Sequence, residues 1–196
     1  MGRFVTVMGR PRKDSTEPSA RERIISAFWE LLDEMPYPEI KVSALLRRSG
    51  VSPNTLYRHF DGYDALVETA LNEALDARLA SAMVSGESWA SALAPDAAAR
   101  FRRVALFASD GSGILPSILK RSLKELWMKE MGLRQESLDA LTALELDFMF
   151  AGVVEMLGRI GRGDLHADQS VVQRFFERPL GTGILETMRS ISSSSE

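Results

Sequence analysis

The fold of this chain is decided by the run Val42-Ser-Ala-Leu-Leu-Arg-Arg-Ser-Gly-Val-Ser-Pro-Asn-Thr-Leu-Tyr-Arg-His-Phe60. Its first half predicts a short helix that ends at Gly50, because glycine accepts the left-handed conformation found just after a helix. Its second half opens with Ser52 and Pro53, residues favoured as N-cap and first helical residue. Two short helices joined by a tight glycine-containing turn predict a helix-turn-helix.

The second helix of this run has an outer face suited to a DNA groove. Leu56 and Phe60 are four residues apart, so they share the buried face. No acidic residue lies between Gly50 and Phe60, which favours approach to a polyanion. The alternative is a helical hairpin with a purely structural role. The side chains expected to face outward, towards base edges and phosphates, are Pro53, Asn54, Thr55, Tyr57, Arg58 and His59.

The segment before the run predicts a third helix. Ser19 and Glu22 have the spacing of a capping box. Apolar residues then recur at helical spacing from Ile24 to Met35, and Pro36 ends the pattern. Residues 19–64 are therefore a predicted three-helix, DNA-binding helix-turn-helix domain.

The segment after the run is also predicted to be helical. A long helix from Tyr63 to about Val84 is expected to connect the first domain to a larger C-terminal helical domain at residues 65–191. Residues 1–18 are expected to be a flexible basic arm, and residues 192–196 a disordered tail. No segment predicts a β-strand, so the fold class is all-α. The other helices predicted are Ala97–Ala108 with Asp96 as its cap, Ile114–Met131, Gln135–Arg159, Asp168–Arg178 and Leu185–Ile191.

Four short matches point to a known family. They are Gly50-Val51-Ser52, Thr55-Leu56-Tyr57, His59-Phe60 and Ala65-Leu66. With them, the run from Arg21 to Leu71 resembles the N-terminal domain of TetR-family transcriptional repressors. That family's pattern is G-V-S-x-x-T-L-Y-x-H-F, then a lysine-containing turn and an apolar helix. The rest of the chain is similar to the family only in being helical.

The resemblance implies roles for individual residues. Ser43, at the start of its helix, would contact a phosphate. Asn54 and Thr55 would lie near base edges or phosphates, and Tyr57 and His59 would contact the DNA backbone or thymine methyl groups. The DNA-binding set expected in this region is Ser43, Ser52, Pro53, Asn54, Thr55, Tyr57, Arg58, His59 and Tyr63.

Two further features bear on DNA binding. Tyr63 stands where the family usually has lysine, so its hydroxyl would donate to a phosphate while one counterion-releasing contact is lost. The net charge of −3 is uneven, with four basic and no acidic residues at positions 1–13. Arg10, Arg12 and Lys13 either enter an adjacent minor groove or only keep the arm soluble.

A DNA reader of this type is expected to be a homodimer. One recognition helix reads few base pairs, whereas a two-fold dimer reads a pseudo-palindromic operator. Two C-terminal helices have apolar faces wider than packing against their own core would need, which suggests that they also contact a partner. The alternative is that each is an ordinary buried helix. The candidates are Leu138, Leu141, Leu144, Met149, Val153 and Met156 from one helix, and Val171, Val172, Phe175 and Phe176 from the other.

The resemblance also implies a ligand pocket in the C-terminal domain. An apolar or aromatic ligand is favoured, and its binding would move the connecting helix and release the repressor from its operator. The alternative is a dimeric DNA binder or interaction protein controlled by a protein partner. The pocket candidates, which would otherwise fill an ordinary core, are Trp89, Phe101, Phe107, Trp127 and Phe148.

Composition argues against other functions. With no cysteine and two histidines, disulfides, a metal site, a cofactor and an enzyme are not expected. The glycines from Gly158 to Gly163 lack the strand and the Lys-Ser/Thr ending of a phosphate-binding loop, so they are predicted to end a helix.

No apolar stretch approaches the ~20 residues that span a bilayer, and no export signal is visible. A cytoplasmic protein is therefore expected.

Overall fold

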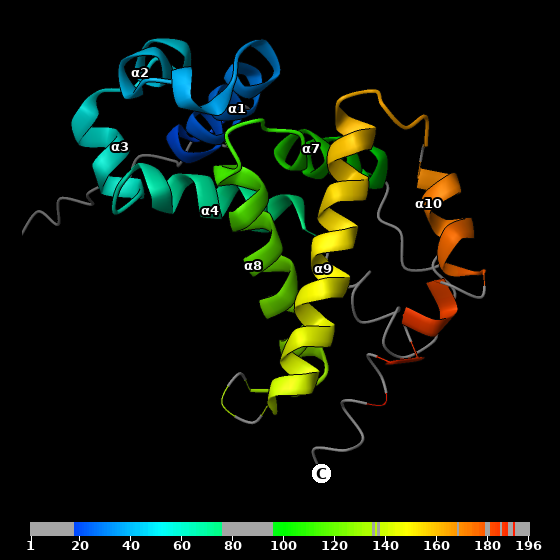
Figure 1. Ribbon diagram of the computed structural model, residues 1–196. Helices are drawn as coiled ribbons and strands as arrows, with labels where there is room; N and C mark the ends of the chain where they lie inside the picture. The colour runs from blue at the N-terminus through cyan, green and yellow to red at the C-terminus, as the bar shows by residue number, and fades with distance from the viewer. Residues whose placement is uncertain are drawn as a thin grey trace, which may run out of the picture.

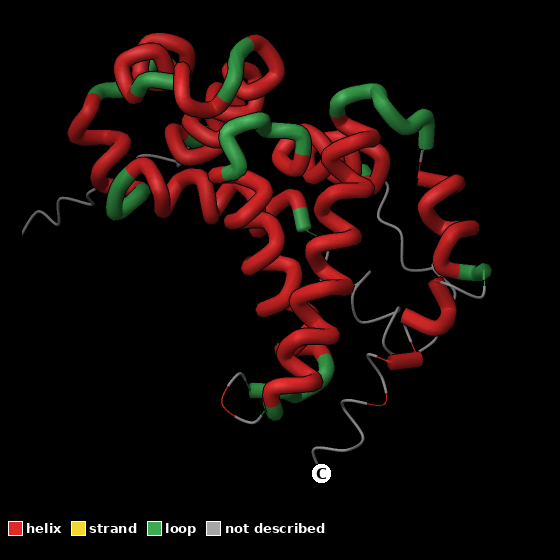
Figure 2. Tube along the Cα trace, viewed as in Figure 1, coloured by secondary structure: helices red, strands yellow, loops and turns green. Residues whose placement is uncertain are grey.

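The computed structural model describes residues 18–75, 96–134, 136, 138–167, 169–178, 181–184, 186–187 and 190. Every regular element in these ranges is a helix, which confirms the predicted all-α class (Figure 2). The N-terminal helices lie together at one end, and α8 (Ile114–Glu130) and α9 (Ala140–Gly161) run side by side away from them (Figure 1). None of the helices in these ranges is both long and apolar enough to cross a membrane.

The N-terminal end is built as the sequence predicts. Its elements are α1 (Ala20–Glu34), η1 (Tyr37–Glu39), α2 (Val42–Ser49), α3 (Pro53–His59) and α4 (Tyr63–Ala74). The Ser19 hydroxyl accepts a hydrogen bond from the Glu22 amide at 3.2 Å, and the Glu22 carboxylate accepts one from the Ser19 amide at 2.7 Å. This capping box starts α1, and Gly50 ends α2 with a φ of 65°.

One buried core extends from the N-terminal helices into the C-terminal part. Phe28 of α1 and Phe107 of α7 (Ala97–Ala108) are fully buried, with ring centroids 6.5 Å apart in an edge-to-face arrangement. Trp29 of α1 lies 5.9 Å from Phe107 by the same measure. The core continues into α8 and α9. A second, smaller cluster consists of Trp127, Met128, Met131, Leu133, Leu146 and Phe150.

The predicted connecting helix is shorter than its apolar pattern suggested. α4 ends at Ala74, because Leu75 adopts an extended conformation with ψ of 138°, so the prediction of a helix to Val84 is wrong. In a longer helix the carbonyl of Glu73 would accept from an amide four residues on. Here that carbonyl accepts a hydrogen bond from the Arg100 guanidinium at 2.6 Å. A side chain of α7 thus supplies a partner at the end of α4.

The starts of α7 and α9 also differ in detail from the prediction. Asp96 precedes α7 as expected, but its carboxylate accepts from Arg100 at 2.8 Å and its side chain does not cap the helix. α9 begins at Ala140 rather than Gln135, because the Asp139 carboxylate accepts from the Thr142 amide at 2.8 Å and caps the helix there.

The end of α9 corrects the interpretation of its glycines. Gly158 and Gly161 were predicted to end the helix, but both lie within α9, and the left-handed residue after it is Gly163 with a φ of 80°. A Cβ atom on Gly158 would lie 2.7 Å from the Ala108 carbonyl oxygen, and one on Gly161 would overlap the Ala105 carbonyl oxygen. These glycines therefore let the backbone of α9 approach the backbone of α7.

We expect Gly161→Ala to lower the free energy of unfolding by about 1–3 kcal/mol, because the added methyl group overlaps α7 and the helices must separate. Gly183→Ala is the matched control, since Gly183 is helical and an added Cβ there meets nothing within 4 Å. That control should be neutral or stabilising by about 0.5–1 kcal/mol. Urea unfolding followed by circular dichroism measures both, and equal stabilities for the two variants would contradict the close helix contact.

Candidate nucleic-acid interface

Local chemistry and one buried face position α3. The Ser52 hydroxyl accepts a hydrogen bond from the Thr55 amide at 3.2 Å and lies 2.9 Å from the Thr55 hydroxyl. Leu56 is 1% exposed, and Phe60 directly after the helix is also buried. The start and the inner face of α3 are therefore both fixed, and its outer face is left to solvent.

The outer face of α3 carries the residues that the sequence singles out. Tyr57 is 59% exposed, although a large aromatic side chain on a free surface is costly to solvate. Thr55 is half-buried beside its capping partner. The other exposed members of the predicted set are Ser43 of α2 together with Ser52, Pro53, Asn54, Arg58 and His59.

Tyr63 does not lie on this surface, which corrects the prediction that its hydroxyl contacts a phosphate. Its hydroxyl is buried and has no hydrogen-bond partner within the described part of the chain. The ring stacks on Tyr37, with centroids 6.0 Å apart, and lies 6.5 Å from Phe28. Burial raises the pKa of Tyr63, so the phenol stays neutral. The residue at the position taken by lysine in the family pattern is here partly buried and packs against the core.

The charge on α2 and α3 is more positive than the predicted set alone suggested. No acidic residue occurs between Lys41 and Phe60. Lys41 and Arg47 are exposed and form no ion pair within the described residues. They are absent from the DNA-binding set predicted from the sequence. The signal was present, because the stretch without acidic residues extends back to Lys41.

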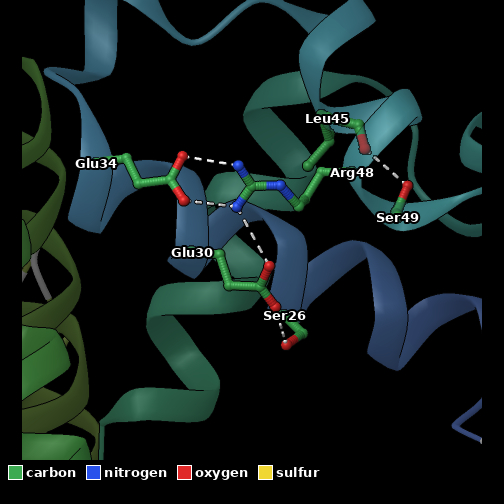
Figure 3. Close-up of polar contacts among 6 residues, drawn as sticks. All are labelled: Ser26, Glu30, Glu34, Leu45, Arg48 and Ser49. Atoms are coloured by element: carbon green, nitrogen blue, oxygen red, sulfur yellow. Dashed lines mark hydrogen bonds and ion pairs between the residues drawn. The ribbon is translucent and has the colours of Figure 1, made fainter.

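Arg48, next to Arg47, is instead held by two carboxylates of α1 (Figure 3). Its guanidinium donates to Glu34 at 2.7 and 2.9 Å and to Glu30 at 3.3 Å. The hydrogen bond from Arg48 lowers the pKa of Glu34, and the two glutamates raise the pKa of Arg48. Both partners are therefore charged near neutral pH, and the positive charge of Arg48 is largely compensated.

The comparison with known families agrees with this geometry. Residues 24–70, from α1 into α4, match the model described as bacterial regulatory proteins, tetR family. Over these residues the chain has the N-terminal helix-turn-helix domain of tetR-family regulators. It is therefore a DNA-binding transcription regulator, and tetR-family proteins are regulators rather than enzymes. No match to a curated protein was found.

The arm and the predicted ligand pocket of the regulator are only partly described. Arg10, Arg12, Lys13 and Trp89 lie outside the described residues. The other four pocket candidates do not converge. Phe107 is in the first core, Phe101 is half-buried against it, and Trp127 is in the second cluster. Phe148 is 82% exposed on α9, so it does not line the interior of a single chain.

The described dimer candidates are of two kinds, exposed and half-buried. Leu141 and Leu144 are 67% and 68% exposed on α9, and Val171 of α10 (Gln169–Phe176) is 39% exposed. Other members are half-buried: Leu138, Met149, Val153 and Phe175 pack against their own chain's cores, and Met156 is also half-buried. The side chains of Val172 and Phe176 lie outside the described part of the structure.

We expect Tyr57→Ala combined with His59→Ala to weaken binding to a duplex selected from random DNA by about 100-fold or more, since each base contact contributes about 1–3 kcal/mol. Helicity should be unchanged, because both side chains are exposed. His166→Ala is the control, since His166 is exposed and far from α3 in sequence. Fluorescence anisotropy measures the affinities, and undiminished binding by the double variant would show that α3 does not read DNA.

A second substitution tests the position of Tyr63. Tyr63→Phe removes a buried hydroxyl that has no partner among the described residues, so stability should stay equal or rise. The affinity for DNA and its dependence on salt should be unchanged, because no phosphate contact is lost. A loss of affinity of similar size at every salt concentration, in a variant that folds normally, would mean that the hydroxyl does contact a phosphate, because a neutral donor releases no counterion.

Proposed function

We propose that this regulator is a repressor that binds a palindromic operator as a homodimer and is released by a small apolar ligand. The observation that carries the DNA-reading part is the exposed outer face of α3 in a TetR-family domain, set among uncompensated cations. Selection of bound sequences from random duplex DNA tests it. An inverted repeat should be enriched, and failure to enrich any sequence would refute sequence-specific binding.

The dimer is supported by an apolar face on α9 that the described part of the chain leaves uncovered. Leu141, Leu144 and Phe148 are three and four residues apart, so they project from the same face of the helix. Their exposed fractions are far above those of ordinary core leucines and phenylalanines, and such faces mark interaction sites. A second copy of the chain would cover this face and place a second α3 for the other half-site.

The ligand is supported by the composition of the second cluster. Trp127, Met128 and Met131 meet Phe150 there, and aromatic and methionine side chains adapt to apolar ligands. α8 contributes to both cores, through Leu119 in the first and Trp127 in the second. A ligand that enlarged the second cluster would displace α8 and α9 relative to the first core.

α7 offers a route from that displacement to the DNA-binding helices. Its Arg102 pairs with Asp33 of α1 at 3.0 Å, and the guanidinium of Arg103 lies 5.5 Å from the ring centre of Trp29. Because α7 also contacts the backbone of α9 at two glycines, a shift of α9 would carry α7 with it. The ligand would then favour a second arrangement of α1 and α4, as a population shift requires.

We expect Phe148→Glu to convert the protein from a dimer to a monomer. Two-fold symmetry would bury one carboxylate from each chain in the apolar interface, and burying an unpaired charge is costly. Light scattering should give twice the chain mass of 21.7 kDa for the native protein and once that mass for the variant. Ile114→Glu is the control, since Ile114 is 48% exposed at the start of α8. A dimeric F148E protein would place the interface elsewhere.

A further inference from the structure

Arg47 and Arg48 are adjacent in the sequence of α2, but they differ in their ion-pair partners. Arg47 is exposed without an ion-pair partner among the described residues, whereas Arg48 has two. Two guanidinium nitrogens of Arg48 meet two carboxylate oxygens of Glu34 in a paired arrangement (Figure 3). That fork-to-fork geometry fixes orientation as well as distance.

The acceptors on α1 are themselves ordered. Glu30 accepts from Arg48 through one carboxylate oxygen and from the Ser26 hydroxyl, at 3.1 Å, through the other. Ser26, Glu30 and Glu34 are spaced by four residues, so they lie along one face of α1. Figure 3 shows this face turned towards Arg48. The cluster therefore ties one turn of α2 to two turns of α1.

Apolar packing holds α2 against α1, with Leu45 fully buried and Val42, Ala44 and Leu46 packed partly buried against the same core. α2 has eight residues, too few for a stable isolated helix. Its fully buried apolar residue is Leu45, and its other buried residue, Ser49, donates back to the Leu45 carbonyl at 2.8 Å. The apolar packing sets no hydrogen-bonded register, whereas the Arg48 pairs add directional contacts at the end of α2 next to the turn into α3.

The same pairs contribute little to folding stability. The Arg48 side chain is 34% exposed, and those of Glu30 and Glu34 are 51% and 50% exposed. Ion pairs with such exposure are weak in water. Their effect is to set geometry, and to offset one of the two carboxylate charges beside a surface that approaches phosphates.

We propose that Arg48 is a positioning residue for DNA recognition, which holds α2 on α1 through Glu30 and Glu34 and does not itself contact a phosphate. The proposal rests on the DNA-binding function of α2 and α3. It predicts that the contribution of Arg48 depends on the two glutamates. A direct phosphate contact would not depend on them.

The experiment measures affinity for the duplex selected by the native protein, over a range of salt concentrations. Arg48→Gln should weaken binding about tenfold in the native background. In an E30Q/E34Q background it should cost no more than Arg47→Gln costs there. Arg47→Gln is the charge-matched control, since it removes one exposed positive charge from the adjacent position.

The salt dependence and a conservative variant separate positioning from direct contact. For Arg48→Gln the slope of log affinity against log salt should be unchanged, because no phosphate contact is lost. Arg48→Lys should lose nearly as much affinity as Arg48→Gln, since lysine lacks the planar fork. Melting followed by circular dichroism identifies the temperature range in which every variant is folded, and binding is measured there.

Three results would overturn the proposal. The first is native affinity for Arg48→Gln. The second is an equal loss from Arg48→Gln in both backgrounds, with a slope reduced by about 0.9. The third is native affinity for Arg48→Lys. If the native protein selects no duplex, the DNA-binding function fails and the positioning role falls with it. Selection by the native protein together with any of the three results refutes the positioning role alone.

Discussion

The packing of α1 against α7 sustains the DNA-reading surface. α2 and α3 have eight and seven residues, and helices of that length do not persist alone in water. Their place is set by α1, whose Phe28 and Trp29 meet Phe107 of α7 in the shared core. The outer face of α3 is thereby fixed relative to α9 and to the apolar face that α9 presents.

α7 is attached differently on its two sides. Towards α9 it makes close backbone contacts at Gly158 and Gly161, which leave no room for an added carbon. Towards α1 it adds the solvent-exposed pair of Arg102 with Asp33 to the aromatic packing, and such pairs rearrange at little cost. Under the proposed mechanism α7 therefore moves with α9, and the contacts that change are those with the DNA-binding helices.

Local chemistry allowed the helix-turn-helix to be predicted almost to the residue. The capping box at Ser19, the left-handed turn at Gly50 and the Ser52 cap act over a few neighbours, so their effect is visible in the sequence. The corrected features depend on distant partners. α4 stops where Arg100 meets Glu73, and Tyr63 stacks on Tyr37 with its hydroxyl buried. Arg47 and Arg48 differ only because Glu30 and Glu34 of α1 face one of them.

The most direct test of the central claim, that α3 reads DNA as one of a two-fold pair, is hydroxyl-radical footprinting on the duplex that the native protein selects. Two protected segments should appear on one face of the duplex, related by two-fold symmetry, with centres about 10 base pairs or a multiple of one helical turn apart. A single protected segment, or uniform protection along the duplex, would contradict the account.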